Sequence, residues 1–337
     1  MTDRKSASQA FLAAHGWGDA ARGFLAGDAS DRSYDRVTRG GETAVLMDAP
    51  PGTGDDPAAF VAIALHLQSI GLSAPRLLAQ DLAQGFLLIE DLGDALFARV
   101  IAAAPQREAP LYLAAADVLA HLHAHPAPAG LPDFSAEDWA KAAGFALDWY
   151  AYGATGLRPE KTAFVATLTE ALQRHADGPR VMILRDYHAE NLLELPGRQG
   201  VAAVGLLDFQ LAQMGQPGYD LVSLLQDARR DVSADVVARV TTHFSDTTGR
   251  DLAAFQTGCA VLGAQRAMRI LGVFARLCLV GGKPGYLRLI PRVWAQLQSN
   301  LAHPALSDLR AICAPLLPPP TEAALHVIGE KCATHSP

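Results

Sequence analysis

The sequence has 337 residues, of which 50% are hydrophobic and 19% are charged, and its formal net charge is -7 at pH 7. This length and apolar content predict two domains, or one enzyme of two lobes, with a sizeable core rather than a largely disordered chain. The negative charge argues against a general nucleic-acid binder, because such proteins usually carry a basic surface.

Signals for targeting and for redox chemistry are weak. Residues 1–14 hold no apolar run typical of a signal peptide, and no stretch of about 18 apolar residues predicts a membrane span. The four cysteines, at positions 259, 278, 313 and 332, lie too far apart in the sequence to indicate a metal or redox pair. We therefore expect a cytoplasmic protein with reduced thiols and no membrane partner.

The first quarter of the chain predicts a β-sheet accompanied by helices. Residues 7–18 have the pattern of an amphipathic helix, and residues 23–49 alternate short strands with turns. Residues 58–70 carry apolar side chains at three- and four-residue steps, which indicates another helix. Short strands follow at residues 76–79 and 86–89.

After Leu92 the pattern becomes mostly helical. Helices are predicted at residues 95–103, 108–125, 135–151, 160–175, 219–228, 233–247, 251–280, 284–300 and 321–329. One β-rich stretch at residues 181–207 interrupts them. Strands gathered at one end, rather than alternating with helices, predict an α+β fold with two lobes. The small β-rich N lobe would cover residues 1–92, and the large, mainly helical C lobe would cover residues 93–337.

Two polar motifs follow apolar strands in the β-rich stretch. Arg185-Asp186 is followed by Asn191, and Asp208-Phe209 comes 17 residues after Asn191. This is the spacing of the catalytic loop and metal-binding turn of kinases, where catalysis depends on positioning and charge neutralisation. Asp186 would lie beside the attacking hydroxyl, while Asn191 and Asp208 would supply the oxygen ligands that Mg²⁺ prefers. A surface loop with ordinary charges is the alternative, but it does not explain both motifs at this distance.

With these motifs the chain resembles the aminoglycoside phosphotransferase superfamily, which has the protein-kinase-like fold and includes choline and homoserine kinases. The segments that carry the resemblance are residues 27–37, 46–51, 90–94, 185–187, 207–210, 219–224, 263–266 and 270–277. The combination of Met-Asp-Ala-Pro-Pro at residues 47–51 with Gln265-Arg266 is similar to bacterial kinases that phosphorylate the anomeric hydroxyl of N-acetylmuramate and N-acetylglucosamine in cell-wall recycling.

Two positions depart from the superfamily pattern. The superfamily usually has His two residues before the catalytic Asp, where this chain has Leu184. The strand over residues 43–47 commonly ends in a Lys that holds the nucleotide phosphates, and here Met47 stands in its place. The helix that follows has no Glu or Asp to pair with such a Lys, so both halves of the ion pair are missing together. We expect Arg32 or Arg36 to contact the phosphates instead.

The resemblance also implies nucleotide-binding residues. Gly27, Asp28 and Ser30 lie in a turn that resembles the phosphate-covering loop, where glycine lets the backbone approach the phosphates. Glu90 and Leu92 lie in the predicted hinge, whose backbone groups would bind the adenine edge of ATP. A plain hairpin turn and a solvated strand end are the alternatives for these two segments.

The acceptor site is less sharply indicated. Arg229 and Arg230 follow a predicted helix, Gln265 and Arg266 lie together on another, and His188 lies inside the catalytic loop. Arginine can bind a carboxylate with two hydrogen bonds, and N-acetylmuramate carries a lactyl carboxylate, so these residues fit an amino-sugar acceptor. A solvated helix face is the alternative for the charged residues.

We therefore expect an enzyme that uses ATP and Mg²⁺ to phosphorylate a small amino sugar, with a monomer favoured and no nucleic-acid partner. A related kinase for an aminoglycoside or an amino alcohol is one alternative. A non-catalytic binding protein with the same fold is another, motivated by Met47 and Leu184. The presence of Asp186, Asn191 and Asp208 together argues against this last alternative.

Overall fold

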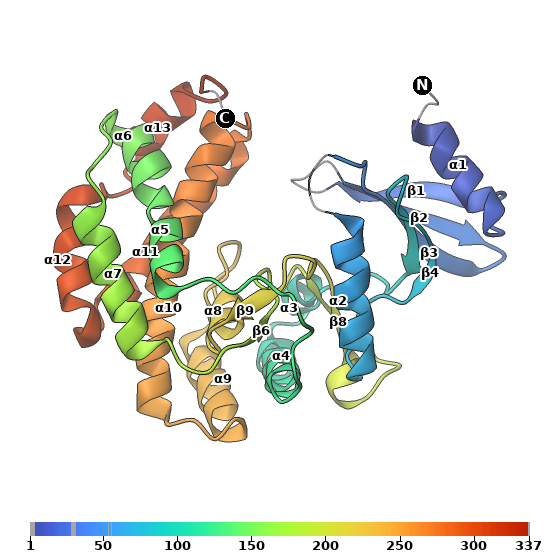
Figure 1. Cartoon of the computed structure of the whole chain (residues 1–337), viewed down its shortest axis with the longest axis horizontal. Helices are drawn as coiled ribbons and strands as arrows, with labels where there is room; N and C mark the ends of the chain where they lie inside the picture. Colours follow the sequence, from blue (N-terminus) through green and yellow to red (C-terminus); the bar gives the residue numbers. More distant parts are fainter. Residues whose placement is uncertain (1–3, 28–31, 53, 55, 336–337) are drawn as a thin grey trace. The chain divides into compact units, whose positions relative to one another are not determined.

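The computed structural model describes the chain except for residues 1–3, 28–31, 53, 55 and 336–337. The chain folds into two compact units, a first unit of Met1–Pro128 with Leu184–Ala212 and a second unit of Ala129–Ile183 with Gln213–Pro337. The first unit contains a five-stranded sheet, and the second is mostly helical (Figure 1). The predicted lobe boundary after Leu92 does not coincide with the bounds of these two compact units, so it stays a prediction.

Five antiparallel strands form the sheet of the first unit in the order β1-β2-β3-β5-β4. The strands are β1 (Ala21–Gly27), β2 (Ser33–Arg39), β3 (Glu42–Asp48), β4 (Leu77–Asp81) and β5 (Phe86–Glu90). Alternate side chains of a strand face opposite sides, and Ala44 and Leu46 of β3 share a core with Phe11 of helix α1 (Arg4–Ala14). Val45 and Met47 are buried as well, so β3 is covered on both faces.

The rest of the first unit holds the segments that carry the two polar motifs. Its helices are α2 (Pro57–Ser69), α3 (Phe97–Ala103) and α4 (Glu108–His123), with the short 3-10 turns η1 (Pro105–Arg107) and η3 (Gly200–Ala203). Strands β7 (Leu192–Glu194) and β8 (Val204–Leu206) form an antiparallel hairpin between the motifs. Helix α2 begins where the Asp56 side chain accepts a hydrogen bond from the Ala58 N–H, with Pro57 at the first helical position.

The second unit packs its helices around α10 (Leu252–Leu279), which is 28 residues long (Figure 1). Its other helical segments are α5 (Ala136–Ala143), the π-helix η2 (Ala146–Ala151), α6 (Tyr152–Thr155), α7 (Thr162–His175), α8 (Tyr219–Leu225), α9 (Ala234–Thr247), η4 (Pro284–Leu289), α11 (Ile290–Leu301), η5 (Pro304–Leu306), α12 (Ser307–Leu316) and α13 (Glu322–Glu330). Two three-residue strands, β6 (Val181–Ile183) and β9 (Gln213–Gly215), pair with each other. A Cβ at Gly272 of α10 would lie 2.3 Å from the Phe145 carbonyl, so glycine is needed for this close approach.

The expected α+β class is confirmed, and so are most predicted helices. The helices predicted at residues 58–70 and 251–280 match α2 and α10 within one residue at each end. The helix predicted at residues 135–151 begins at a capping box between Ser135 and Asp138, but α5 ends before Gly144. Helix α12 and strand β9 were not predicted. Strand β9 has only three residues, too few to show the alternation of apolar and polar residues that indicates a strand. Across the described chain, each helix lacks the length or the hydropathy needed to cross a membrane.

Candidate active site

The segment from Leu184 to Asn191 forms a closed loop within the first unit. The Asn191 amide nitrogen Nδ2 donates a hydrogen bond to the backbone oxygen of Asp186 at 2.9 Å, and the Asn191 N–H donates to the His188 oxygen at 2.8 Å. The short step from Asp186 to Asn191 therefore lets one side chain close the loop. This closure fixes the backbone that carries the Asp186 carboxylate.

Two contacts join this loop to the second motif. The Leu207 N–H donates to the Asn191 oxygen at 3.0 Å, and Asn191 Nδ2 lies 3.5 Å from Asp208 Oδ2. Asn191 directly precedes β7 and Asp208 closely follows β8, so pairing of these strands brings together residues that are 17 positions apart. Asn191 thus contacts both Asp186 and Asp208.

Two residues of these motifs have left-handed backbone conformations. Arg185 has a φ of 72° and Asp208 has a φ of 56°; in the described chain, Ala333 is the one other non-glycine residue with positive φ. Such a conformation costs about 1–3 kcal/mol at a residue with a side chain. Strain of this size persists where the surrounding structure holds a residue in place, and it is concentrated at functional sites.

The carboxylate of Asp208 is held by several side chains of the first unit. Gln210 Nε2 donates to Asp208 Oδ1 at 2.8 Å, and Arg32 Nη2 lies 3.4 Å from the same oxygen. The Arg32 side chain is only 3% exposed. Phe209 stacks on Phe60 of α2 with ring centroids 4.9 Å apart. Sequence reasoning missed Gln210, although it directly follows the motif, and Phe60, whose only signal was the apolar period of a helix.

Hydrogen bonds anchor the loop on neighbouring helices of the same unit. The Tyr187 hydroxyl donates to the Ala115 oxygen of α4 at 2.9 Å, and the Ala98 N–H of α3 donates to the Ala189 oxygen at 2.9 Å. His188 is buried, and its Nε2 lies 3.3 Å from Asn191 Nδ2. His188 therefore contacts the amide that closes the loop.

The turn between β1 and β2 lies partly outside the described residues. Gly27 pairs with Ser33 across the hairpin, whereas Asp28 and Ser30 belong to the stretch that is not described. In β3, Met47 is fully buried. A methionine thus packs into the core at the position where a phosphate-binding lysine is common.

Arg36 forms ion pairs with two carboxylates that follow β5. Its guanidinium lies 2.7 Å from Asp91 and 2.9 Å from Asp94. Hydrogen bonds to Asp94 and Asp91 raise the pKa of Arg36 above its ordinary value. Burial by itself raises the pKa of the Asp91 carboxyl, but hydrogen bonds from Arg36 and the Gly93 N–H outweigh this and hold that pKa below its ordinary value. Of the two candidate arginines, Arg32 is the one beside Asp208.

The predicted hinge is tied to the sheet through Glu90. Its N–H donates to the Arg76 oxygen at 2.8 Å, and its carboxylate lies 2.7 Å from Arg198 and 3.2 Å from the Arg76 side chain. Both the N–H and the side chain of Glu90 are thus engaged within the first unit. Leu92, two residues further on, is half-buried.

Gln265 and Arg266 are tied to other elements of the second unit. Gln265 is fully buried, and its Nε2 donates to the Trp139 oxygen at 2.9 Å. Arg266 is 8% exposed, and its Nη2 donates to the Ser223 hydroxyl at 2.8 Å. These bonds join α10 to α5 and α8, which gives both side chains a structural role that the sequence did not reveal.

Arg229 and Arg230 follow α8 in the second unit, next to a buried acid. The Arg229 N–H donates to Asp227 Oδ1 at 2.8 Å. Asp227 is 1% exposed, and burial raises the pKa of its carboxyl. The sequence indicated the two arginines but not the burial of Asp227.

Residues 23–255 match the phosphotransferase enzyme family. The chain belongs to this family. This phosphotransferase is 39% identical to the N-acetylmuramate/N-acetylglucosamine kinase of Caulobacter vibrioides, over 92% of this chain and 96% of that protein. It is 33% identical to the protein of the same name from Pseudomonas aeruginosa, over 90% of this chain and 91% of that protein.

The fold of this phosphotransferase is also found in solved kinase structures. A microcompartment-associated aminopropanol kinase superposes with a TM-score of 0.59 at 18% identity, covering 90% of this chain and 98% of that one. This likeness confirms the expected protein-kinase-like fold.

The motif cluster of this phosphotransferase has a donor set that suits a hard cation. Within the described residues, no group of three or more His, Cys, Asp or Glu side chains is placed to hold a metal ion. Asp208 offers a carboxylate, and Asn191, whose Nδ2 is engaged by Asp186, offers its amide oxygen. Mg²⁺ is usually bound by one or two protein ligands together with phosphate oxygens and water, so these residues fit it.

Proposed function

We propose that this protein transfers the γ-phosphoryl group of ATP to the anomeric hydroxyl of N-acetylmuramate or N-acetylglucosamine, in the recycling of cell-wall sugars. The observation that carries the proposal is the contact of Asn191 with both Asp186 and Asp208. This contact supports a single site that combines a base for the acceptor hydroxyl with ligands for the phosphate-bound cation. The names of the relatives support an amino sugar as the acceptor.

In this proposal Asp186 accepts the proton of the attacking hydroxyl. A general base has to lie within hydrogen-bond reach of that proton, and closure of the loop by Asn191 fixes the backbone of Asp186. Gln210 orients the Asp208 carboxylate through its 2.8 Å hydrogen bond. Mg²⁺, when held by Asp208 and Asn191, would neutralise charge on the phosphates.

We place the missing phosphate contact on Arg32. Its side chain is buried and lies 3.4 Å from Asp208. Arg36, the other candidate, is already paired with Asp91 and Asp94. A guanidinium can donate two hydrogen bonds to phosphate oxygens. Arg32 can therefore take the role of the lysine that is common in the superfamily at the position of Met47.

The remaining nucleotide contacts belong to two backbone segments. The turn that begins at Gly27, with Asp28 and Ser30, is proposed to cover the phosphates. Because the Glu90 N–H already bonds to Arg76, the adenine contact is proposed for the backbone after it, up to Leu92.

For the acceptor we propose a contact with His188 of the first unit, and we keep Arg229 and Arg230 of the second unit as separate candidates for binding a sugar carboxylate. His188 adjoins the loop amide of Asn191. The two arginines carry charge that suits a sugar with a carboxylate. We do not include Gln265 and Arg266 among the proposed acceptor contacts, because their side chains form hydrogen bonds within the second unit.

A phosphorylation assay with the full chain, Mg²⁺-ATP and a panel of acceptors tests the reaction. The panel holds N-acetylmuramate, N-acetylglucosamine, an aminoglycoside and ethanolamine, and phosphorus NMR identifies the phosphorylated atom. We expect ADP and a sugar 1-phosphate from the amino sugars alone. Product from ethanolamine or the aminoglycoside alone would replace the proposed acceptor, and no acceptor-dependent ADP release from any member would refute a kinase for these acceptor classes.

Two variants of the catalytic loop test the role of Asp186. Asp186→Asn removes the base and keeps the shape, so kcat should fall about 10²- to 10⁴-fold. Glu190→Gln removes a carboxylate from an exposed position of the same loop and should change kcat less than about twofold. Unchanged kcat in Asp186→Asn, or an equal loss in both variants, would contradict the assignment.

A further inference from the structure

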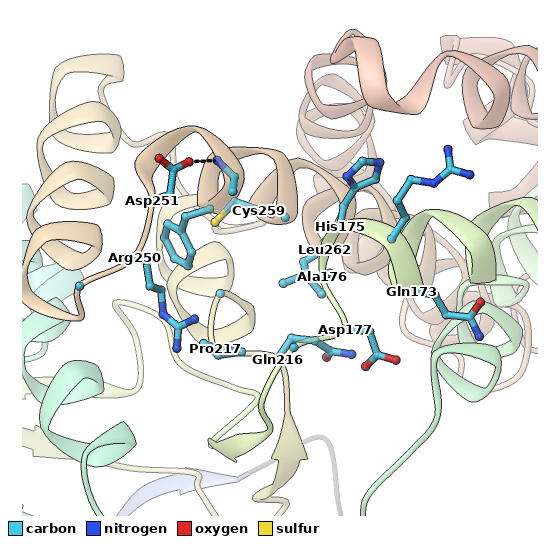
Figure 2. Close-up of a pocket in the computed structure, with 17 residues that line it drawn as sticks. Gln173, His175, Ala176, Asp177, Gln216, Pro217, Arg250, Asp251, Cys259 and Leu262 are labelled. Carbon is cyan, nitrogen blue, oxygen red and sulfur yellow. Dashed lines mark hydrogen bonds between the residues drawn. The ribbon is translucent and has the colours of Figure 1, made fainter.

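A cavity of about 480 Å³ lies within the second unit. The end of α7, the segment just before α8 and the start of α10 form its walls (Figure 2). Sites for small molecules usually have about 300–1,000 Å³, so this cavity has a suitable size. Its lining residues all belong to the second unit, whereas Asp186, Asn191 and Asp208 belong to the first. The proposed catalytic residues therefore do not line it.

One wall of the cavity carries a buried amide that lacks hydrogen bonds. Gln216 is fully buried, and neither its side-chain oxygen nor its nitrogen has a partner within the described residues. An unpaired buried polar group is destabilising, because it has lost its hydrogen bonds to water without gaining others. Figure 2 shows this side chain among those that line the cavity. A ligand with a matching acceptor and donor would recover the lost hydrogen bonds.

The guanidinium of Arg250, at the turn between α9 and α10, is a second unsatisfied group. Its Nε has no hydrogen-bond partner, and Arg250 forms no ion pair with any residue that the structure describes. Burial lowers the pKa of Arg250, as expected for a desolvated cation that forms no ion pair. Burial also raises the pKa of Cys259 to about 12, so this neighbouring thiol is neutral at pH 7 and does not balance the charge.

The other ionisable side chains around Arg250 are engaged or neutral. Asp251 accepts a hydrogen bond from the Ala254 N–H at 2.8 Å, drawn as the dashed line in Figure 2. Asp177 lies 2.8 Å from Arg180. Burial lowers the pKa of His175, so its ring is neutral at pH 7. Among the described residues, Arg250 thus forms no ion pair with the acidic side chains that line the cavity.

We propose that this cavity binds a small organic anion, whose oxyanion accepts hydrogen bonds from the Arg250 guanidinium and the Gln216 amide. Phe255 and Leu262, which also line the cavity, would contact its apolar part. Carboxylates and phosphate monoesters share the required chemistry, because both present oxygens that a guanidinium binds with two hydrogen bonds. The cavity is much larger than the volume of about 30 Å³ that one water occupies, so it has room for carbon atoms beside the oxyanion. This site does not depend on which sugar the enzyme phosphorylates.

Hydrogen–deuterium exchange of the full chain, with succinate or glycerol 3-phosphate added separately, tests the site and distinguishes the two anions. We expect protection of peptides covering residues 173–178 and 249–262 with at least one probe. Arg250→Met should abolish it, whereas Arg239→Met, at an exposed arginine of α9, should keep it. Absence of protection with both probes, or protection that persists in Arg250→Met, would overturn the proposal.

Thermal melting without any anion gives an independent readout. Arg250→Met and Gln216→Leu each remove unsatisfied polar groups, so each should raise Tm by about 1–2 °C. Gln216→Leu should also weaken binding of the protecting probe about tenfold. A lower Tm in both variants would show that these groups have partners in the folded chain and would overturn the proposal.

Discussion

Replacing Arg32 with methionine removes a buried guanidinium and keeps much of its apolar volume. Arg32 lies 3.4 Å from Asp208, and at that distance two unit charges interact by about 5 kcal/mol at an effective dielectric constant of about 20. A phosphate oxygen in contact with the same guanidinium would gain an attraction of the same order. Because Asp208 is 32% exposed and desolvation offsets part of the attraction, we expect a net loss of about 2 kcal/mol in the transition state. This corresponds to about a thirtyfold lower kcat/KM for ATP.

Steady-state kinetics with ATP varied at saturating amino sugar measures this effect. Arg36→Met is the matched control, since Arg36 carries the same charge on the next strand but is paired with Asp91 and Asp94. It should leave the KM for ATP within about twofold while lowering stability. Unchanged kcat and KM in Arg32→Met would refute the reasoning, and a raised KM in Arg36→Met alone would move the phosphate contact to Arg36.

Three further expectations concern side chains of the first unit. Phe60→Ala removes a ring that is 4% exposed and stacked on Phe209, so it should lower the free energy of unfolding by about 3–5 kcal/mol, measured by chemical denaturation, and reduce kcat as Asp208 loses support. Asp91→Asn should lower the free energy of unfolding by about 1–2 kcal/mol at pH 7, because charged hydrogen bonds to Arg36 are lost. The native pKa of Asp91 is depressed, so its contribution is present at neutral pH and disappears as the pH falls through that pKa. Chemical denaturation at a series of pH values should show the free energies of unfolding of the unchanged protein and of Asp91→Asn converging in acid. A difference that stays constant with pH would contradict the depressed pKa of Asp91. Asp94→Asn, at a side chain that is 58% exposed, should cost less than about 1 kcal/mol.

The sequence by itself determined the features that depend on local spacing. The step from Asp186 to Asn191 is short enough for one side chain to close the loop, so the motif could be recognised without any distant contact. The helices at residues 58–70 and 251–280 were predicted because a helix repeats its apolar face every three or four residues. The roles assigned to the motif residues remain predictions, since they depend on ligands.

Only the tertiary structure decided which polar side chains meet. Arg32 and Arg36 lie close together in the sequence, yet one faces Asp208 and the other pairs with carboxylates after β5. Gln265 was predicted to contact the acceptor, but its side chain is fully buried in the second unit. The unsatisfied amide of Gln216 likewise becomes visible only once its surroundings are known. Burial and long-range hydrogen bonds depend on residues far apart in the chain, and no local pattern in the sequence encodes them.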